Sequence, residues 1–299
     1  MVTDVILPIA LFLMMSGMGL SLEIIDFRRI LEYPKAAIVG IASMLILIPA
    51  LGFAIATCAS LSPEMAVGLI LVATCPGGMF SNLLTHFGKA NLALSVGMTA
   101  FVSSIYVFSI PFWTRFALEQ FDAESTHVAP PIEKTIVPLF LFVLVPLAVG
   151  MFVRSRNVEF AMRREGHVKN VSAFLVVLIF IYLGFAQEDT IADDSKQVFP
   201  AVLILNLASV TVAVSLAVIG RLSRKDGLAI VIEHAIRQEG TAIYVAVTVI
   251  GSAQMALPLM INGSIGMGIG LTFLAMFGGD RPLITRLRAY LESRSAESS

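Results

Sequence analysis

Long runs of apolar residues alternate with short polar segments along almost the whole chain. A membrane-spanning helix needs about 20 consecutive, mostly apolar residues. Runs of roughly this length fall at about 4–22, 36–58, 64–86, 91–113, 135–153, 170–187, 198–220, 227–250 and 255–278. The pattern predicts an all-α integral membrane protein with nine transmembrane helices in a single polytopic domain over residues 1–299. The first run has no basic segment before it and no small-residue cleavage site after it, so we expect a retained helix and not a signal peptide.

Lys and Arg gather on one side of this predicted bundle. They follow the first, third, fifth, seventh and ninth spans, whereas "FDAESTHV" and "QEDTIADDSKQ" on the other side are mostly acidic or neutral. Because basic residues in short loops keep their side of the membrane in the cytoplasm, we expect the N-terminus outside, the C-terminus inside and residues 279–299 as a cytoplasmic tail. The predicted location is the cell (inner) membrane. The basic residues that do not fit this orientation are Arg115, Lys134, Lys196 and Arg237.

Composition agrees with a membrane protein and excludes several other classes. Hydrophobic residues make up 57% of the chain and charged residues only 14%, whereas soluble domains carry about 25% charged residues. A net charge of −1 gives no electrostatic basis for binding nucleic acid. Cys58 and Cys75 lie in or beside apolar spans without the spacing of a metal site or a disulfide framework. The sequence therefore predicts no cofactor and no nucleic-acid partner, and it carries no signal for an oligomeric state.

Two spans are interrupted at corresponding positions. A connecting helix at 135–153 separates a first group of spans at 4–113 from a second group at 170–278, so the groups run in opposite directions and we expect inverted repeats. The third span of each group contains residues that break a helix, in "ATCPGGMFSN" and "EHAIRQEGT". Paired breaks of this kind indicate the substrate and ion site of a transporter; the alternative is a simple kink in a packed helix. The break residues are Pro76, Gly77, Gly78 and Gly240.

The eighth span, "GLAIVIEHAIRQEGTAIYVAVTVIG", carries Glu233, Arg237 and Glu239 in its middle. At mid-helix three charges cost roughly 9 kcal/mol on the insertion scale, while about ten Ile, Leu and Val return roughly 5 kcal/mol. A lipid-facing helix is therefore excluded. The charges either form a structural network inside the bundle or line the pathway, and ionisable residues at membrane depth indicate a functional site by default.

Several motifs resemble the bile acid:sodium symporter family. "CPGGMFSNLLTHFGKANLALSVGMTA" resembles its signature, in which Cys-Pro-Gly-Gly precedes Ser-Asn and a later Asn-x-Ala-Leu-Ser-x-x-x-Thr. "SGMGLSLEIIDFRRILEYPK" is similar to its first helix and loop, and the eighth span resembles Glu-x-x-x-Gln-Asn-Ser-Gly. The resemblance covers most of the chain, with its specific motifs in spans one, three, four and eight, and it fits the nine-helix form. It implies two crossing broken helices, sodium as the coupling ion and no enzymatic activity.

The resemblance also implies a first sodium site. The residues of this chain that match its ligands are Ser81, Asn82, Ser95, Thr99 and Glu233. Their chemistry agrees, because a hard monovalent cation prefers oxygen ligands and one carboxylate compensates its charge. Ser95 and Thr99 are four residues apart and so share a helix face. The alternative for these hydroxyls is hydrogen bonding to helical carbonyls or to neighbouring helices.

This chain differs from the family's pattern at the second sodium site. The motif's Gln, Asn and Ser fall on Arg237, Gln238 and Glu239, and the Gln of the second helix falls on Met44. A guanidinium is a permanently charged donor that cannot bind sodium. Arg237 is therefore expected either to replace that cation or to bind the anionic end of a substrate, with Glu239 setting specificity. On a regular helix Arg237 could also pair with Glu233.

Two further residues have open roles. Asn262 either lines the substrate site or belongs to close helix packing in "INGSIGMGIG". His234 either relays protons or makes an interhelical hydrogen bond.

The predicted function is secondary active transport of an organic anion, bile-salt-like or a smaller carboxylate, by alternating access and coupled to sodium through one site. The expected partners are the small organic anion, sodium and the lipid bilayer. The alternative is a proton-coupled or uncoupled transporter in which Arg237 replaces the second sodium. A channel or receptor is more remote. An enzyme is not expected, because the chain shows no nucleophile with its base, no metal cluster and no Gly-x-Ser-x-Gly.

Overall fold

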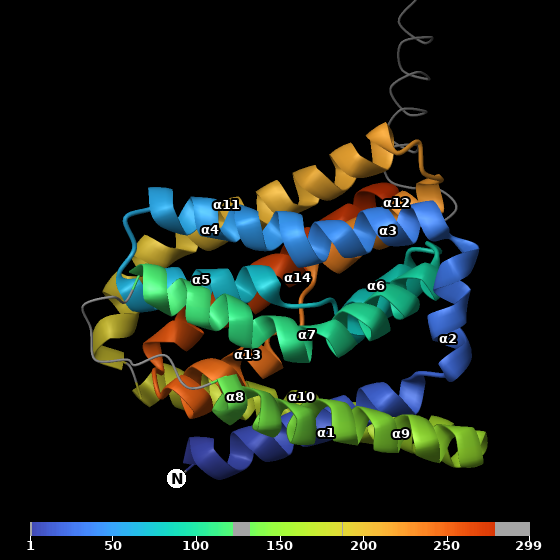
Figure 1. Ribbon diagram of the computed structural model, residues 1–299, viewed down its shortest axis with the longest axis horizontal. Coiled ribbons are helices and arrows are strands. Elements are labelled where there is room, and N and C mark those ends of the chain that lie inside the picture. The colour runs from blue at the N-terminus through green and yellow to red at the C-terminus, as the bar shows by residue number, and fades with distance from the viewer. Residues whose placement is uncertain (1, 122–131, 187, 279–299) are drawn as a thin grey trace, which may run out of the picture.

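The computed structural model describes residues 2–121, 132–186 and 188–278, and these ranges contain helices and connecting segments without a β-strand (Figure 1). The first half consists of α1 (Val2–Ser21), α2 (Ile24–Arg29), η1 (Ile30–Glu32), α3 (Pro34–Ala42), η2 (Ser43–Leu47), α4 (Ile48–Cys58), α5 (Pro63–Thr74), α6 (Met79–Phe87) and α7 (Leu92–Phe121). The second half consists of α8 (Ile132–Leu139), η3 (Phe140–Leu144), α9 (Val145–Arg156), α10 (Val158–Ala186), α11 (Glu188–Ile219), α12 (Arg224–Ala235), α13 (Gly240–Tyr244), η4 (Val245–Ile250), η5 (Gln254–Ala256) and α14 (Leu257–Phe277).

The all-α prediction is confirmed for the described residues. Five helical segments have the length and hydropathy of a membrane crossing, and the bent pair Val5–Ser21 and Ile24–Glu32 makes a sixth if it is counted as one span. The five are Pro34–Cys58, Leu92–Phe121, Ile136–Arg156, Asp194–Ile219 and Gln254–Phe277. Nine crossings therefore remain a prediction, although helices occupy each of the nine predicted ranges.

Helix ends differ from the predicted span ends in three places. α7 continues to Phe121, α10 begins at Val158, and α11 begins at Glu188. The basic segment around Arg163 and the acidic segment around Asp194 are consequently helical and do not form loops. The reason is that hydropathy marks where apolar residues begin, whereas a helix continues through polar residues until a breaker stops it. The predicted tail at 279–299 lies outside the described residues.

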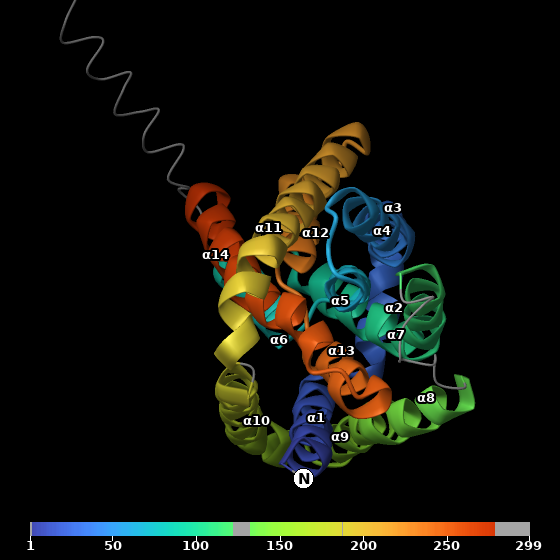
Figure 2. The same cartoon turned by 90° about the vertical axis from the view of Figure 1, so that its left-hand side faces the viewer.

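The helices form two layers. Figure 2 shows α1, α8, α9 and α10 lying together on one side, and α1 packs against both α9 and α10. The remaining helices form a thicker bundle on the other side, with α13 next to α1. α1 and α9 approach closely at Gly19 and Gly150, where an added Cβ would collide with the Leu147 and Ser16 carbonyl oxygens respectively. The connecting segment α2 crosses from the thin layer to the bundle after a 76° bend.

Both predicted helix breaks are present, and they lie against each other. α5 ends at Thr74 and α6 begins at Met79, while α12 ends at Ala235 and α13 begins at Gly240. Residues 77 and 237 form an antiparallel bridge between the two connecting segments. Backbone groups freed from a helix must find partners when no water is available, and these two breaks supply partners to each other. The structure therefore places both halves of the predicted site at one point inside the bundle.

Candidate functional site

The Glu233 carboxylate is the centre of a buried oxygen cluster. Its Oε1 accepts hydrogen bonds from Ser81 Oγ at 2.6 Å, Ser95 Oγ at 2.6 Å and Thr99 Oγ1 at 3.1 Å, and its Oε2 accepts from Thr99 Oγ1 at 3.0 Å. These four side chains come from α6, α7 and α12, and all are 0% exposed. The cluster thus joins three helices at the crossing of the two breaks.

The cluster contains fewer hydrogens than its short oxygen contacts require. Ser81 Oγ lies 2.6 Å from Glu233 Oε1 and 2.7 Å from the Gly78 carbonyl oxygen, while Ser95 Oγ lies 2.6 Å from Glu233 Oε1 and 2.8 Å from Asn82 Oδ1. A hydroxyl donates only one hydrogen. Each serine therefore contacts two acceptor oxygens but has only one hydrogen to donate. The cluster therefore has oxygen lone pairs that are not used in hydrogen bonds, around one carboxylate. Oxygen ligands of this kind are what a sodium ion prefers.

The structure adds one residue to the predicted ligand set. Thr85 is fully buried, and its Oγ1 donates to Ser95 Oγ at 3.2 Å. It lies on α6 one turn after Ser81, so the Ser-x-x-x-Thr spacing would have placed it on the same helix face. Asn82 is half-buried, and its Oδ1 lies 3.4 Å from Thr99 Oγ1.

The backbone at the first break makes room for this cluster. Gly77 has no Cβ, and an added Cβ would collide with the Glu233 carboxylate. Gly78 directly precedes α6, and its N–H donates to Ser81 Oγ at 3.0 Å. The short glycine segment therefore lets the carboxylate approach the main chain.

The Arg237 guanidinium lies at the C-terminal end of α5. Its Nη1 donates to the Ala73 carbonyl at 3.0 Å and to the Cys75 carbonyl at 3.4 Å, and its Nη2 donates to Ser209 Oγ at 3.0 Å. The C-terminus of a helix carries partial negative charge, so a fixed cation is favourable there. Arg237 is 6% exposed, and its Nε has no hydrogen-bond partner.

Arg237 does not form the ion pair with Glu233 that a regular helix would have allowed, so that expectation is wrong. α12 ends at Ala235 and Ile236 is extended, and this redirects the Arg237 side chain towards α5. Both terminal nitrogens of Arg237 are engaged by the protein itself. Met44, the predicted apolar residue at the missing ligand position, is 2% exposed and belongs to an apolar cluster of α3, α7, α11 and α12.

His234 makes structural hydrogen bonds. Its Nδ1 lies 2.8 Å from the Ile230 carbonyl oxygen and its Nε2 lies 2.8 Å from Ser43 Oγ. A carbonyl can only accept, so Nδ1 donates and Nε2 is free to accept. The side chain joins α12 to η2, and neither of these bonds involves Glu233.

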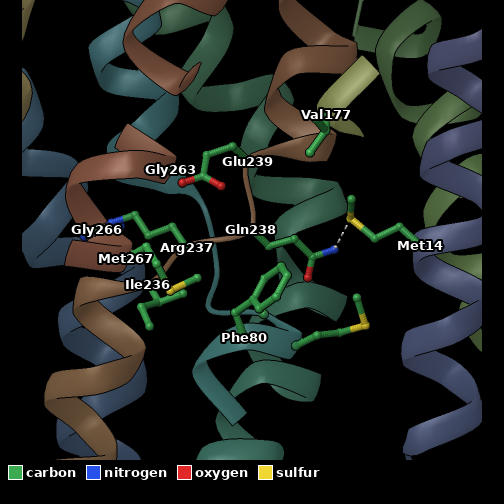
Figure 3. Close-up of a pocket in the computed structure, with 12 residues that line it drawn as sticks. Met14, Phe80, Val177, Ile236, Arg237, Gln238, Glu239, Gly263, Gly266 and Met267 are labelled. Atoms are coloured by element: carbon green, nitrogen blue, oxygen red, sulfur yellow. Dashed lines mark hydrogen bonds between the residues drawn. The ribbon is translucent and has the colours of Figure 1, made fainter. Parts of the chain in front are cut away.

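A cavity of about 230 Å³ lies beside the second break, between the two layers. Figure 3 shows Arg237 and Gln238 extending to opposite sides of the segment between α12 and α13. Gln238 Nε2 contacts the Met14 sulfur at 3.3 Å, and its buried Oε1 has no partner. The lining residues are Met14, Gly78, Met79, Phe80, Val177, Ile236, Arg237, Gln238, Glu239, Gly263, Gly266 and Met267.

Asn262 lies behind this cavity and not at its surface. Its Nδ2 donates to Glu239 Oε1 at 2.6 Å, and its Oδ1 accepts from Asn206 Nδ2 at 2.7 Å. Asn206 in turn donates to the Val202 carbonyl at 2.9 Å. Sequence reasoning missed Asn206 and Ser209, because nothing in α11 alone distinguishes them from packing residues.

Comparison with known proteins identifies relatives of this chain. It is 29% identical over 274 residues, 91% of this chain and 63% of the relative, to "Probable sodium/metabolite cotransporter BASS2, chloroplastic" from Oryza sativa subsp. japonica. It is 28% identical over 200 residues, 67% of this chain and 60% of the relative, to "Uncharacterized sodium-dependent transporter YocS" from Bacillus subtilis (strain 168). It is also 28% identical over 187 residues, 61% of this chain and 52% of the relative, to the ileal sodium/bile acid cotransporter of Homo sapiens.

The chain thus spans less than two thirds of the length of these curated relatives. A family model described as the Sodium Bile acid symporter family matches residues 8–193. This is more than half of the chain, and it includes the first break with the α6 and α7 residues of the oxygen cluster. The resemblance seen in the motifs is confirmed: the chain belongs to the sodium bile acid symporter family, a family of multi-pass membrane transporters and not of enzymes.

Proposed function

We propose that this protein is a secondary active transporter that couples transport of a small organic anion to sodium through one cation site. The observation that carries the proposal is the surplus of oxygen lone pairs around Glu233. Sodium is a substrate in this scheme. The residues that would hold it are Ser81, Asn82, Ser95, Thr99 and Glu233, and Thr85 would orient Ser95.

A cation at this place would stabilise the crossing of the breaks. The Glu233 carboxylate lies at the junction of three helices, buried among the hydroxyls of Ser81, Ser95 and Thr99. A bound cation would neutralise that charge and draw α6, α7 and α12 together. Binding of the ion would therefore favour the arrangement of the breaks that forms the neighbouring cavity, which is how the two substrates become coupled.

The cavity is the proposed site of the organic anion. Met79 and Phe80 line it and form the first turn of α6, whose N-terminus carries partial positive charge. The buried amide of Gln238 lines the same space, and its Nε2, which contacts the Met14 sulfur, is the end that can donate to a carboxylate. The volume of about 230 Å³ lies below the range of roughly 300–1,000 Å³ typical of pockets for drug-sized ligands. A small carboxylate fits this size better than a bile salt.

The two layers are the proposed moving bodies of alternating access. The cavity lies between α1 and α10 of the thin layer and the breaks of the bundle, so relative movement of the layers would open and close it. This differs from rocking of the first helix group against the second, because each layer contains helices of both groups. We also propose that the chain crosses the membrane nine times and contains inverted repeats. Its N-terminus would lie outside, and its location would be the cell membrane.

Arg237 is assigned here as the cation that replaces a second sodium. The terminal nitrogens of its guanidinium donate to carbonyls at the end of α5 and to Ser209. We therefore do not propose Arg237 as a direct ligand of the substrate. The same observation supports the alternative of proton-coupled or uncoupled exchange, since a built-in cation lowers the number of ions that the cycle needs. The coupling experiment must therefore vary sodium and pH separately.

Thermal unfolding of the detergent-purified protein tests the cation site. Sodium chloride is expected to raise the melting temperature relative to equal choline chloride, because a ligand that binds the folded form stabilises it by mass action. The increase should vanish in Glu233→Gln and persist in Glu119→Gln, which neutralises an exposed carboxylate on α7. Equal stability in sodium and choline would contradict the sodium site, and a melting temperature that followed pH alone would favour the proton-coupled alternative.

A further inference from the structure

A second carboxylate lines the cavity without a basic partner. Glu239 directly precedes α13, is 9% exposed and lines the cavity, and Figure 3 shows its carboxylate beside Gly263. Arg237 is two residues away, but its terminal nitrogens donate to α5 and Ser209. Among the described residues, no ion pair within 4.0 Å involves Glu239. A buried carboxylate without a cation in contact is costly, and Arg237 attracts Glu239 only at longer range, so this position favours a ligand with a cationic group.

The carboxylate of Glu239 is held in a fixed orientation. Asn262 donates to its Oε1 at 2.6 Å, Asn206 donates to Asn262 Oδ1 at 2.7 Å, and Asn206 is anchored to the Val202 carbonyl at 2.9 Å. The three side chains connect α13, α14 and α11, and Asn206 and Asn262 are 1% and 0% exposed. A relay of this kind pre-organises an acceptor for a ligand, because the ligand then does not have to order it.

The part of the cavity wall formed by α6 has the opposite charge character to the part formed by Glu239. Met79 and Phe80 present the positive end of α6, as described above, whereas Glu239 presents a negative group from another helix. The lining also includes Arg237 and Gln238, and most of the remainder is apolar, with Met14, Val177, Ile236 and Met267. The cavity is therefore a small apolar space with one anion-attracting end and one cation-attracting end.

We propose that the transported organic acid is a small amino acid in its zwitterionic form, whose carboxylate lies at the N-terminus of α6 and whose ammonium group binds Glu239. This assignment rests on the proposed function and names its substrate class. The ammonium supplies the cation that Glu239 lacks, and Asn262 keeps the accepting oxygen in place. A plain carboxylate of the same length leaves Glu239 buried and unpaired, and sites built for a polar group reject analogues that lack it.

Matched probes test the assignment. The purified protein in saturating sodium chloride is unfolded thermally with ω-amino acids from glycine to 6-aminohexanoate, with the unsubstituted carboxylates of equal length, and with the corresponding alkylamines. At least one amino acid is expected to raise the melting temperature at a concentration about tenfold lower than its matched carboxylate. Glu239→Gln should remove this preference, Glu239→Asp should retain part of it, and Glu119→Gln should leave it unchanged.

Each other outcome overturns a defined part of the scheme. A carboxylate that stabilises as well as its amino acid overturns the zwitterion and leaves the organic-anion function standing. A change in the sodium requirement of Glu239→Gln, with ligand preference intact, would make Glu239 a second sodium ligand and also overturns the proposal. Stabilisation by an alkylamine alone overturns the anion part of the proposed function. No stabilisation by any probe overturns both.

Discussion

The backbone N–H of Gln238 donates to the carbonyl of Pro76 at 2.8 Å, and this bond joins the two helix breaks. Pro76 has no N–H of its own, so its carbonyl is the group through which the first break can pair at this point. Gly78 belongs to both places, since its backbone contacts Ser81 of the oxygen cluster and it also lines the cavity, while Gln238 lines the cavity. The backbone contact between the breaks therefore lies next to both proposed sites.

Gly77→Ala should damage the ion site. A Cβ at this position would collide with the Glu233 carboxylate, so either the carboxylate or the break must move. We expect a loss of about 1–3 kcal/mol in the free energy of unfolding from overpacking, together with loss of sodium-dependent stabilisation. Thermal unfolding in sodium and in choline measures both effects.

Gly268→Ala is the matched control. Gly268 lies in α14, and an added Cβ would meet nothing within 4 Å. Ala favours a helix over Gly by roughly 0.5–1 kcal/mol, so this variant should be as stable as the parent or slightly more stable. Retained sodium dependence in Gly77→Ala would show that the close approach of Gly77 to Glu233 has no role in the site.

Thr99→Val should raise the half-saturating sodium concentration by about tenfold, which corresponds to about 1.4 kcal/mol. Val keeps the shape of Thr and removes the hydroxyl that lies 3.1 and 3.0 Å from the two Glu233 oxygens. Sodium titration of the melting temperature provides the measurement. Thr114→Val on the same helix is the control, because the buried Thr114 hydroxyl has no partner. Equal shifts in the two variants would contradict a specific role for Thr99.

The oxygen cluster could be predicted from the sequence because its members follow local rules. Ser95 and Thr99 share a helix face by spacing, and Ser81 and Asn82 follow directly after the first break. Glu233 had to face the bundle because of the cost of a lipid-exposed charge. The partners of Arg237 could not be predicted, since they depend on where the second break redirects the side chain.

Helix positions were also more predictable than helix ends. The long apolar runs indicate where helices occur, and Pro76, Gly77 and Gly78 lie in the first break. The second break comprises residues 236–239, and Gly240, predicted as a break residue, is the first residue of α13. Neither signal reports how far a helix continues into polar sequence, which explains the extensions of α7, α10 and α11. The two-layer arrangement depends on contacts between distant segments, such as Gly19 with Gly150, and periodicity does not encode such pairs.

Gly150→Ala should weaken the thin layer without changing the ion site. Its Cβ would collide with the Ser16 carbonyl oxygen and would separate α9 from α1. We expect a lower melting temperature, with a cost of about 1–3 kcal/mol, and an unchanged half-saturating sodium concentration. Gly166→Ala on α10, where an added Cβ meets nothing within 4 Å, serves as control. A large change in sodium affinity would show that the packing of the thin layer affects sodium binding in the bundle.

Arg237→Gln should create a requirement for an additional cation. The substitution removes the positive charge from the α5 carbonyls of Ala73 and Cys75 and introduces an amide oxygen in its place. We expect a loss of about 1.5–3 kcal/mol in choline, the usual contribution of a hydrogen bond to a charged group, and partial recovery in sodium. The sodium titration of the melting temperature should also become steeper than in the parent. Arg237→Lys keeps the charge and should retain the shallow titration, although an ammonium does not reproduce the planar guanidinium. A variant Arg237→Gln that binds sodium with unchanged steepness would show that Arg237 does not occupy the place of a second ion.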